Sequence, residues 1–431
     1  MDSLKLINIG QLVTFDSEMD EMVALEQVEV AIEGTQFTEV GKNLGDADQI
    51  LDCRGKLVTP GFVDPHTHPV FLNSREDEFA MRLQGATYEE IAKAGGGIVN
   101  SINDVRSASE SVLISRVNAR MDRFLSLGTT TVECKSGYGL NTKSELKSLK
   151  VMDEVNQVHD IDLIPTFMGG HAFPPEFEKD HDGYIDLICN EMIPAVSEQG
   201  IAKFNDVFCE NGYFSVEQSC KILDTGKKYG LIPRIHADEF EDSGGAESAA
   251  KTGSISADHL MAVGNEGILK MAEKGVIATL LPGTTFFLGK TDYAPYQKLK
   301  DAGVEIALAS DFNPGSCSIQ SMPFVLSLAC IYMKIPIMDA VKAATYTSAK
   351  SLLIEREVLS NWEKEGWVDT FRSLHPNEPD HYTWWRQFGG MREANVGWRI
   401  DYIMASKSAA KRIKDAFIWP NILGSDHCPI G

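Results

Sequence analysis

The sequence predicts an α/β fold, a (β/α)8 TIM barrel preceded by a small β unit and followed by an unrelated α/β fragment. Between residues 57 and 352, apolar strand-like runs alternate with helical stretches, a pattern typical of parallel βα units. Several of these runs end in a polar residue, and barrels build their active sites at the carboxyl ends of their strands. The 431 residues leave room for a barrel of about 250 residues and for further units.

The predicted β unit covers residues 1–56. Apolar runs at 4–9, 28–32 and 37–40 alternate with polar residues as half-buried strands do, and Gly34 and Gly45 punctuate them. Glycine is common in the turns between such strands. We therefore expect a small β-sandwich ahead of the barrel.

The barrel is predicted over residues 57–352. Its eight strands are expected near 57–64, 129–134, 162–168, 204–209, 231–236, 255–259, 276–281 and 304–310. Mixed charges at helical spacing over 110–123 and 143–154 predict outer helices with one solvated face. The run 323–333 is apolar but shorter than the ~20 residues of a membrane helix, so we expect a buried helix there.

Two histidines, His66 and His68, directly follow the first predicted strand. Side chains at i and i+2 share one face of a strand, so both imidazoles can point to one place in the barrel mouth. His236 and Asp311 end two later runs, which adds a third imidazole and a carboxylate. Such a set suits zinc or iron with one position left open for chemistry. A lone HxH pattern often arises by chance among buried histidines, but the matching strand ends favour a metal centre.

Further motifs carry a resemblance to a known family. They are His66-Thr67-His68, ECKSGYGL at 133–140, FMGGH at 167–171, HADE at 236–239, His259, and SDFNPGS at 310–316. Over about residues 4–352 the chain resembles the imidazolonepropionase family of the amidohydrolase superfamily. The resemblance implies a hydrolase of histidine degradation that opens the cyclic amide of 4-imidazolone-5-propanoate to give N-formimidoyl-L-glutamate. A deaminase of a cyclic amidine or nucleobase, from the same superfamily, is the alternative, and an inactive fusion product is another.

The same resemblance assigns roles to individual residues. It implies one divalent or trivalent metal ion, zinc or iron, held by His66, His68, His236 and Asp311. Its catalytic residues would be Glu239, His259 and Asp311, although His259 could instead only orient its neighbours. The substrate contacts would be Arg75, Tyr138, His171, Asn313, Gly315 and Ser316, with Tyr88 as a weaker candidate.

Arg75 is the residue expected to bind the propionate group of the substrate. An anion recognised within an acidic protein needs a local cation, and the planar guanidinium suits a carboxylate. The alternative for Arg75 is an ordinary surface arginine. Gly315 could likewise serve only its own turn.

The last 79 residues differ from the rest of the chain. All six tryptophans lie there, and 10 Lys and Arg offset 11 Asp and Glu, so nearly all of the net charge of −22 belongs to residues 1–352. DTFR at 369–372, YTWW at 382–385, WRIDY at 398–402 and SDH at 425–427 resemble the C-terminal part of exonuclease III class AP endonucleases. The first half of that family is missing, which points to a fusion. The resemblances also imply that the small β unit lacks its usual C-terminal strands.

The composition of the chain restricts the kinds of molecule that it is expected to bind. A strongly acidic body repels nucleic acid, so we expect a small-molecule substrate and no DNA cleavage by the tail, although Asp401, Asp426 and His427 match catalytic positions of that family. Eight cysteines without a CxxC pattern, and an N-terminus without a basic and apolar leader, predict a cytoplasmic protein that binds no membrane. A homodimer is compatible with this composition. The glycines at 95–97 lack the Lys-Ser/Thr of a phosphate loop and predict a loop over the barrel mouth.

Overall fold

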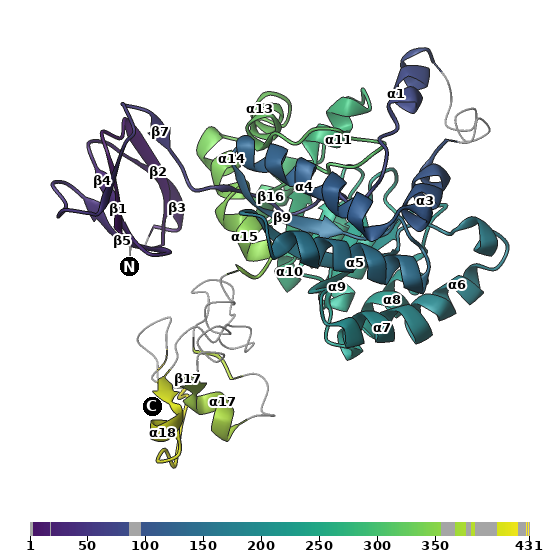
Figure 1. Cartoon of the computed structure of the whole chain (residues 1–431). Helices are drawn as coiled ribbons and strands as arrows, with labels where there is room; N and C mark the ends of the chain where they lie inside the picture. The colour runs from purple at the N-terminus through teal and green to yellow at the C-terminus, as the bar shows by residue number, and fades with distance from the viewer. Residues whose placement is uncertain are drawn as a thin grey trace. The chain divides into compact units, whose positions relative to one another are not determined.

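The computed structural model describes residues 3–17, 19–85, 96–354, 367–375, 381–383, 403–420, 428 and 430. The backbone divides into two compact units, Met1–Leu352 and Leu353–Gly431. Figure 1 shows the first unit in purple to green and the second in green to yellow.

The N-terminal part of the first unit consists of two small sheets. One has the order β5-β4-β1-β6 and the other β3-β2-β7. Their bounds are β1 (Ser3–Ile7), β2 (Gln11–Asp16), β3 (Glu21–Leu25), β4 (Glu29–Glu33), β5 (Gln36–Gly41), β6 (Gln49–Asp52) and β7 (Leu57–Val58). Ile9, Leu12 and Val30 are buried between them. Strands β2, β3 and β6 were not predicted from the sequence, because short strands with one exposed face carry a weak apolar signal.

A parallel barrel follows, with strand order β16-β15-β14-β13-β11-β10-β9-β8. The strands are β8 (Phe62–Asp64), β9 (Thr129–Lys135), β10 (Asp162–Gly170), β11 (Phe204–Cys209), β12 (Ile232–Pro233), β13 (Ile235–Ala237), β14 (Ser256–His259), β15 (Ile277–Leu280) and β16 (Ile306–Leu308). The last and first strands meet just beyond their ends, through a parallel bridge between Thr67 and Phe312. The predicted TIM barrel is confirmed.

The first predicted strand is divided in two. Leu57 and Val58 pair with β2 of the small unit, and only Phe62–Asp64 pair with β9 of the barrel. Pro60 lacks an N–H and Gly61 has no side chain to pack, so the residues between β7 and β8 cannot continue a central strand. The crossing between the two parts of the unit therefore lies at residues 59–61.

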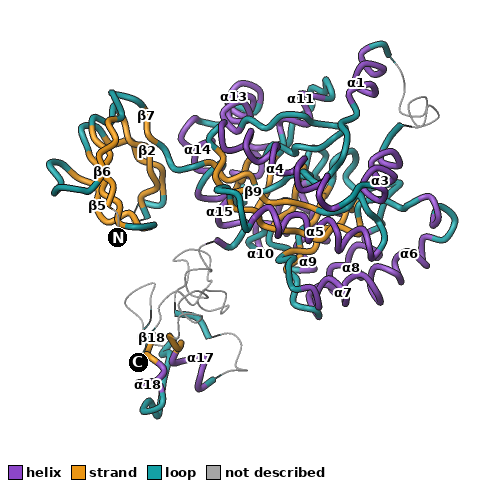
Figure 2. Tube along the Cα trace, viewed as in Figure 1, coloured by secondary structure: helices purple, strands orange, loops and turns teal. Residues whose placement is uncertain are grey.

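Helices surround the barrel in Figure 2. They are α1 (Glu76–Leu83), α3 (Ile98–Ser107), α4 (Glu110–Ser126), α5 (Thr142–Asn156), α6 (His181–Leu187), α7 (Ile193–Gln199), α8 (Val216–Lys228), α9 (Gly245–Thr252), α10 (Asn265–Lys274), α11 (Pro282–Phe287), α12 (Tyr296–Asp301), α13 (Met322–Tyr332), α14 (Ile337–Ala343) and α15 (Tyr346–Ser351). A short 3-10 turn, Pro175–Phe177, precedes α6, and a π turn, Ile188–Met192, joins α6 to α7. The side chains of Ser109, Asn141 and Ser215 cap α4, α5 and α8 at their N-termini, as these residue types favour.

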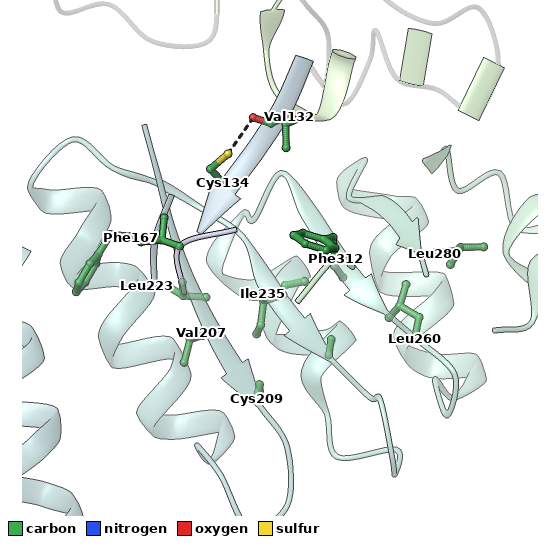
Figure 3. Packing of buried hydrophobic residues seen from close by; sticks show 14 of the residues in the cluster. Val132, Cys134, Phe167, Val207, Cys209, Leu223, Ile235, Leu260, Leu280 and Phe312 are labelled. Carbon is green, nitrogen blue, oxygen red and sulfur yellow. Dashed lines mark hydrogen bonds between the residues drawn. The ribbon is translucent and has the colours of Figure 1, made fainter. Parts of the chain in front are cut away.

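Alternation along the strands sorts apolar from charged side chains. Val132 and Cys134 of β9 and Val207 and Cys209 of β11 belong to the apolar cluster that also includes Leu223 of α8 (Figure 3). Residues on the opposite face, such as Glu133 and Lys135, are also fully buried, but within the barrel. Since successive side chains of a strand point to opposite faces, β9 supplies an apolar face to the helices and a charged face to the barrel interior.

The apolar helix α13 is not buried on all sides, which corrects the sequence prediction. Val325, Leu328 and Ala329 face the core, whereas Ile331 and Tyr332 are 59% and 51% exposed. A barrel's outer helix contacts the sheet along one stripe only, so an apolar sequence alone does not enclose it. Among the described residues, no helix combines the length and apolarity needed to span a bilayer.

The second unit is small. Strands β17 (Trp367–Asp369) and β18 (Met404–Ser406) pair antiparallel, and the short helices α17 (Thr370–Leu374) and α18 (Lys407–Ala410) follow them. Phe371, Ala416, Ile418 and Cys428 form its apolar cluster. The described part of the tail thus has a separate small core.

Candidate metal centre

The barrel mouth gathers five side chains from the ends of four separate strands. His66 and His68 follow β8, His236 lies on β13, His259 ends β14, and Asp311 follows β16; all five are almost fully buried. His259 and Asp311 have positive φ angles of 79° and 55°. Non-glycine residues adopt this conformation at a cost, and such strain is concentrated at functional sites.

Three donor atoms lie close together at this place. The Nε2 atoms of His66 and His68 are 3.3 Å apart, and Oδ1 of Asp311 lies 3.4 Å from the first and 3.6 Å from the second. Ligands bound at 2.0–2.2 Å in a tetrahedron are about 3.3–3.6 Å from one another. These side chains therefore fit a first-row metal ion without rearrangement.

His236 and His259 form a second candidate group, which shares His66 with the first. Each offers a ring nitrogen within 4.8 Å of one on His66 and of each other's, and the ring centroids of His66 and His236 are 4.4 Å apart. Burial is the main cause that lowers the pKa of His66, His68 and His236 well below the ordinary value. Neutral imidazole is the form that binds a metal, so the three rings are in the ligating state.

Asp311 and Glu239 are carboxyl groups with unusual acidity. Burial raises the pKa of Asp311 to about 7, while Thr284 Oγ1 donates to Asp311 Oδ2 at 2.5 Å. Burial and the nearby charge of Asp311 raise the pKa of Glu239 to about 8. Glu239 Oε2 lies 3.7 Å from Nε2 of His259, whose pKa burial lowers to about 4. In the metal-free protein both members of that pair are therefore uncharged at neutral pH, with the proton on the Glu239 carboxyl group.

The predicted substrate contacts gather around the same mouth. Asn313 Oδ1 accepts from the backbone N–H groups of Gly315 and Ser316 at 2.8 and 2.7 Å, and its Nδ2 donates to Ser316 Oγ at 2.8 Å. The Arg75 backbone N–H donates to Pro314 O at 2.8 Å. This links the arginine to the loop after β16 and leaves its side chain beside Gly315.

Two aromatic residues lie beside His68. The ring of His171 stacks on His68 with centroids 5.1 Å apart, and Tyr138 lies 5.1 Å from His171. Nδ1 of His171 lies 2.9 Å from Gly137 O and must donate to it, which leaves Nε2 as an acceptor. Tyr88, and Asp401, Asp426 and His427 of the tail, lie outside the described residues.

The glycine-rich stretch does not form a phosphate cradle among its described residues. Gly97 precedes α3, and its N–H donates to the Glu78 carboxylate at 2.7 Å. A carboxylate at this helix start would repel a phosphate. The remainder of the stretch lies outside the described residues.

The charged side chains inside the barrel and the neighbours of Arg75 were not predicted from the sequence. Lys135, Arg234, Asp206 and Asp258 are fully buried below the histidines. Glu78 Oε2 lies 3.8 Å from Arg75 Nε, and Arg82 Nη2 donates to Gly315 O at 2.9 Å. A signal was present, because Arg234 interrupts the apolar run Ile232–Ile235 and charged residues are almost never fully buried unless they are paired.

The chain is similar to several known proteins, although no family model matches it. An imidazolonepropionase of Geobacillus thermodenitrificans is 49% identical over 345 residues, covering 78% of this chain and 81% of that protein. One from Alkaliphilus metalliredigens is 44% identical over 360 residues, covering 80% and 85%. Both matches extend over most of the relative.

Solved structures share the fold at low sequence identity. A triazine hydrolase variant superposes with a TM-score of 0.64 and 18% identity, covering 82% of this chain and 83% of that one. A guanine deaminase of C. acetobutylicum gives 0.59 and 17%, covering 81% and 86%. A third, an atrazine chlorohydrolase of Arthrobacter aurescens complexed with zinc, gives 0.60 and 16%, covering 81% and 83%.

Proposed function

The chain belongs to the imidazolonepropionase family, and on this premise we propose that it hydrolyses the ring C–N bond of 4-imidazolone-5-propanoate to give N-formimidoyl-L-glutamate in histidine degradation. The observation that carries the proposal is the convergence of His66, His68 and Asp311 donor atoms at 3.3–3.6 Å. This geometry is combined with the family relationship, which supplies the substrate.

The proposed cofactor is one metal ion held by His66, His68, His236 and Asp311. Nitrogen and oxygen donors suit zinc and iron alike, and a structural neighbour is described with zinc bound. When bound, the ion would act as a Lewis acid that polarises the substrate carbonyl and lowers the pKa of water.

We assign proton transfer to Glu239. Its neutral carboxyl can donate to the ring nitrogen that leaves, and it then becomes a base for the next turnover. His259, 3.7 Å from Glu239, would orient this carboxyl and the attacking water. Asp311, with its Oδ2 bound to Thr284, presents Oδ1 to the same space and would help to orient the water.

The substrate would lie in the barrel mouth, between the loop after β16 on one side and Tyr138 and His171 on the other. Arg75 would bind the propionate group through its guanidinium, with Asn313, Gly315 and Ser316 shaping the loop beside it. Tyr138 and His171 would contact the imidazolone ring from the other side. Tyr88 remains a weaker proposed contact.

The remaining proposals concern the whole chain. The tail would be a partial endonuclease-like fragment without nuclease activity, and the small β unit would lack its C-terminal strands. The eight cysteines are free thiols, which supports a cytoplasmic location. The partner would be the small-molecule substrate alone, without nucleic acid or membrane.

The test is turnover by the full chain reconstituted with Zn²⁺ or Fe²⁺ and given freshly prepared imidazolonepropionate. Loss of the substrate's ultraviolet absorbance together with formation of formimidoylglutamate is expected. Ammonia release from guanine would instead favour a deaminase. Metal-loaded, folded protein that turns over neither compound would contradict the proposal.

A further inference from the structure

Five charged side chains fill the barrel below the candidate metal centre. They are Glu133, Lys135, Asp206, Arg234 and Asp258, and each has a relative exposure of 0%. Barrel interiors are usually filled by branched apolar residues. Burying a charge costs free energy unless it is paired and hydrogen-bonded. The partners of these five side chains therefore indicate what they do in the barrel.

One line of contacts leads to His66. Oδ2 of Asp258 lies 2.7 Å from Nδ1 of His66, and Arg234 Nη2 donates to the same oxygen at 3.4 Å. Arg234 is fixed in turn, because its guanidinium donates to the backbone oxygens of Ser351 and Pro65 at 3.0 and 2.9 Å. The carboxylate is therefore held between an anchored cation and the imidazole.

A second series of contacts leads to His236, again from a cation through a carboxylate to the imidazole. Oδ1 of Asp206 lies 3.1 Å from Nδ1 of His236, and Nζ of Lys135 lies 3.3 Å from Oδ2 of Asp206. Lys135 also donates to both carboxylate oxygens of Glu133 at 2.8 Å. Glu133 Oε2 in turn accepts from the N–H of Thr67, the residue between His66 and His68, at 3.2 Å.

Each arrangement selects one tautomer. A carboxylate only accepts hydrogen bonds, so the proton must be on Nδ1 of the imidazole that faces it. The lone pair then lies on Nε2, the atom of His66 that lies 3.3 Å from His68. His68 differs, since its buried Nδ1 has no hydrogen-bond partner among the described residues.

We propose that Asp258 and Asp206 are positioning residues that fix His66 and His236 as Nε2 metal ligands, and that Arg234 and Lys135 hold those two carboxylates in place. The inference deepens the proposed function, because it rests on both histidines being metal ligands. It predicts that metal binding depends on residues that do not touch the metal. Partners of this kind contribute about 10- to 100-fold to metal affinity.

The experiment measures the metal dissociation constant of the full chain by competition with a chelator. Asp258→Asn and Asp206→Asn preserve shape but remove the charge, and each is expected to weaken Zn²⁺ binding about 10- to 100-fold. Asp224→Asn is the matched control, since Asp224 is exposed and pairs with Lys227 on the same helix. Zn²⁺ affinity within twofold of the wild type in both folded variants would overturn the inference.

A measurement on the unsubstituted protein covers the case in which these variants do not fold. In chain labelled with ¹⁵N-histidine, the NMR signals of His66 and His236 are expected to show Nδ1–H in the metal-free and zinc-loaded states. An Nε2–H signal for either residue would contradict the proposal. Substrate turnover is scored separately: weakened metal binding without any turnover by the wild type would refute the proposed function and support this inference.

Discussion

The guanidinium of Arg75 lies against the α-carbon of Gly315, although 240 positions separate them in the sequence; a Cβ on Gly315 would overlap the Nη2 and Cζ atoms of the arginine. The guanidinium of Arg75 therefore packs directly on the backbone of Gly315. The pair joins the loop after β8 to the loop after β16, on either side of the barrel closure.

Gly315→Ala is expected to displace Arg75 and to weaken recognition of the propionate group. A charge-assisted hydrogen bond contributes about 1.5–3 kcal/mol, so KM for imidazolonepropionate should rise about 10- to 100-fold while zinc content stays the same. Gly45→Ala is the control, because a Cβ there has no neighbour within 4 Å. Unchanged steady-state kinetics of the Gly315 variant would remove Arg75 from the proposed substrate site.

Glu239→Gln is expected to stabilise metal-free protein at alkaline pH. The folded-state pKa of Glu239 is about 8, above its ordinary 4.5, so its stabilising contribution is complete below pH 4.5 and is lost as pH rises through 8. One pKa unit corresponds to about 1.4 kcal/mol, enough to raise the Tm of the variant above that of the wild type by several degrees near pH 8–9.

The difference in Tm should close as pH approaches 4.5, where both proteins have a neutral side chain at this position. Glu273→Gln, at an exposed carboxylate, should give no difference at either pH. Thermal unfolding of EDTA-treated protein across this range provides the comparison. A Glu239 variant less stable than the wild type at pH 9 would be inconsistent with a buried, protonated carboxyl group.

His68→Asn is expected to abolish tight metal binding. The replacement removes one of the three donors that lie 3.3–3.6 Å apart, and a metal site with a missing ligand holds its ion weakly. Elemental analysis after gel filtration should show about one metal per wild-type chain and little in the variant. His181→Asn, at an exposed histidine that stacks on Phe173, should retain the metal. Full occupancy in the His68 variant would place the metal elsewhere.

Phe371→Ala is expected to disrupt the tail without changing hydrolysis. Phe371 is the large member of the small apolar cluster in the second unit, and removing such a ring costs about 3–5 kcal/mol. Limited proteolysis should cleave the variant faster within residues 353–431, while kcat and KM stay within twofold of the wild type. A parallel loss of turnover would show that the tail supports the barrel.

No magnesium-dependent nicking of abasic DNA is expected from the full chain. The net charge of −22 opposes binding of a polyanion, and a commercial AP endonuclease serves as the positive control. Robust nicking by purified protein, sensitive to replacement of Asp426, would contradict the proposal for the tail.

Local sequence patterns predicted most of the barrel. Strands such as β9 and β11 were found within one or two residues, because continuous apolar runs between helical stretches are a strong signal. The small β unit was predicted less completely, and α13 was assigned too much burial, because periodicity does not reveal which neighbours cover a surface. The candidate site residues were named from strand ends and motifs, but the interior charges were not, since their meaning depends on the partner each one meets.

The sequence by itself determined which residue types end which strands: two histidines after the first, and His236, His259 and Asp311 after later ones. The alternation of side chains along a strand depends only on neighbouring residues, so the sequence alone fixes the face of the strand on which each side chain lies. Only the tertiary structure decided which of these groups meet, through the bridge from Thr67 to Phe312 and the pairing of Asp258 with His66. Those contacts join positions about 190 to 250 residues apart, and they follow from barrel closure, which brings distant strands together by packing rather than by sequence proximity.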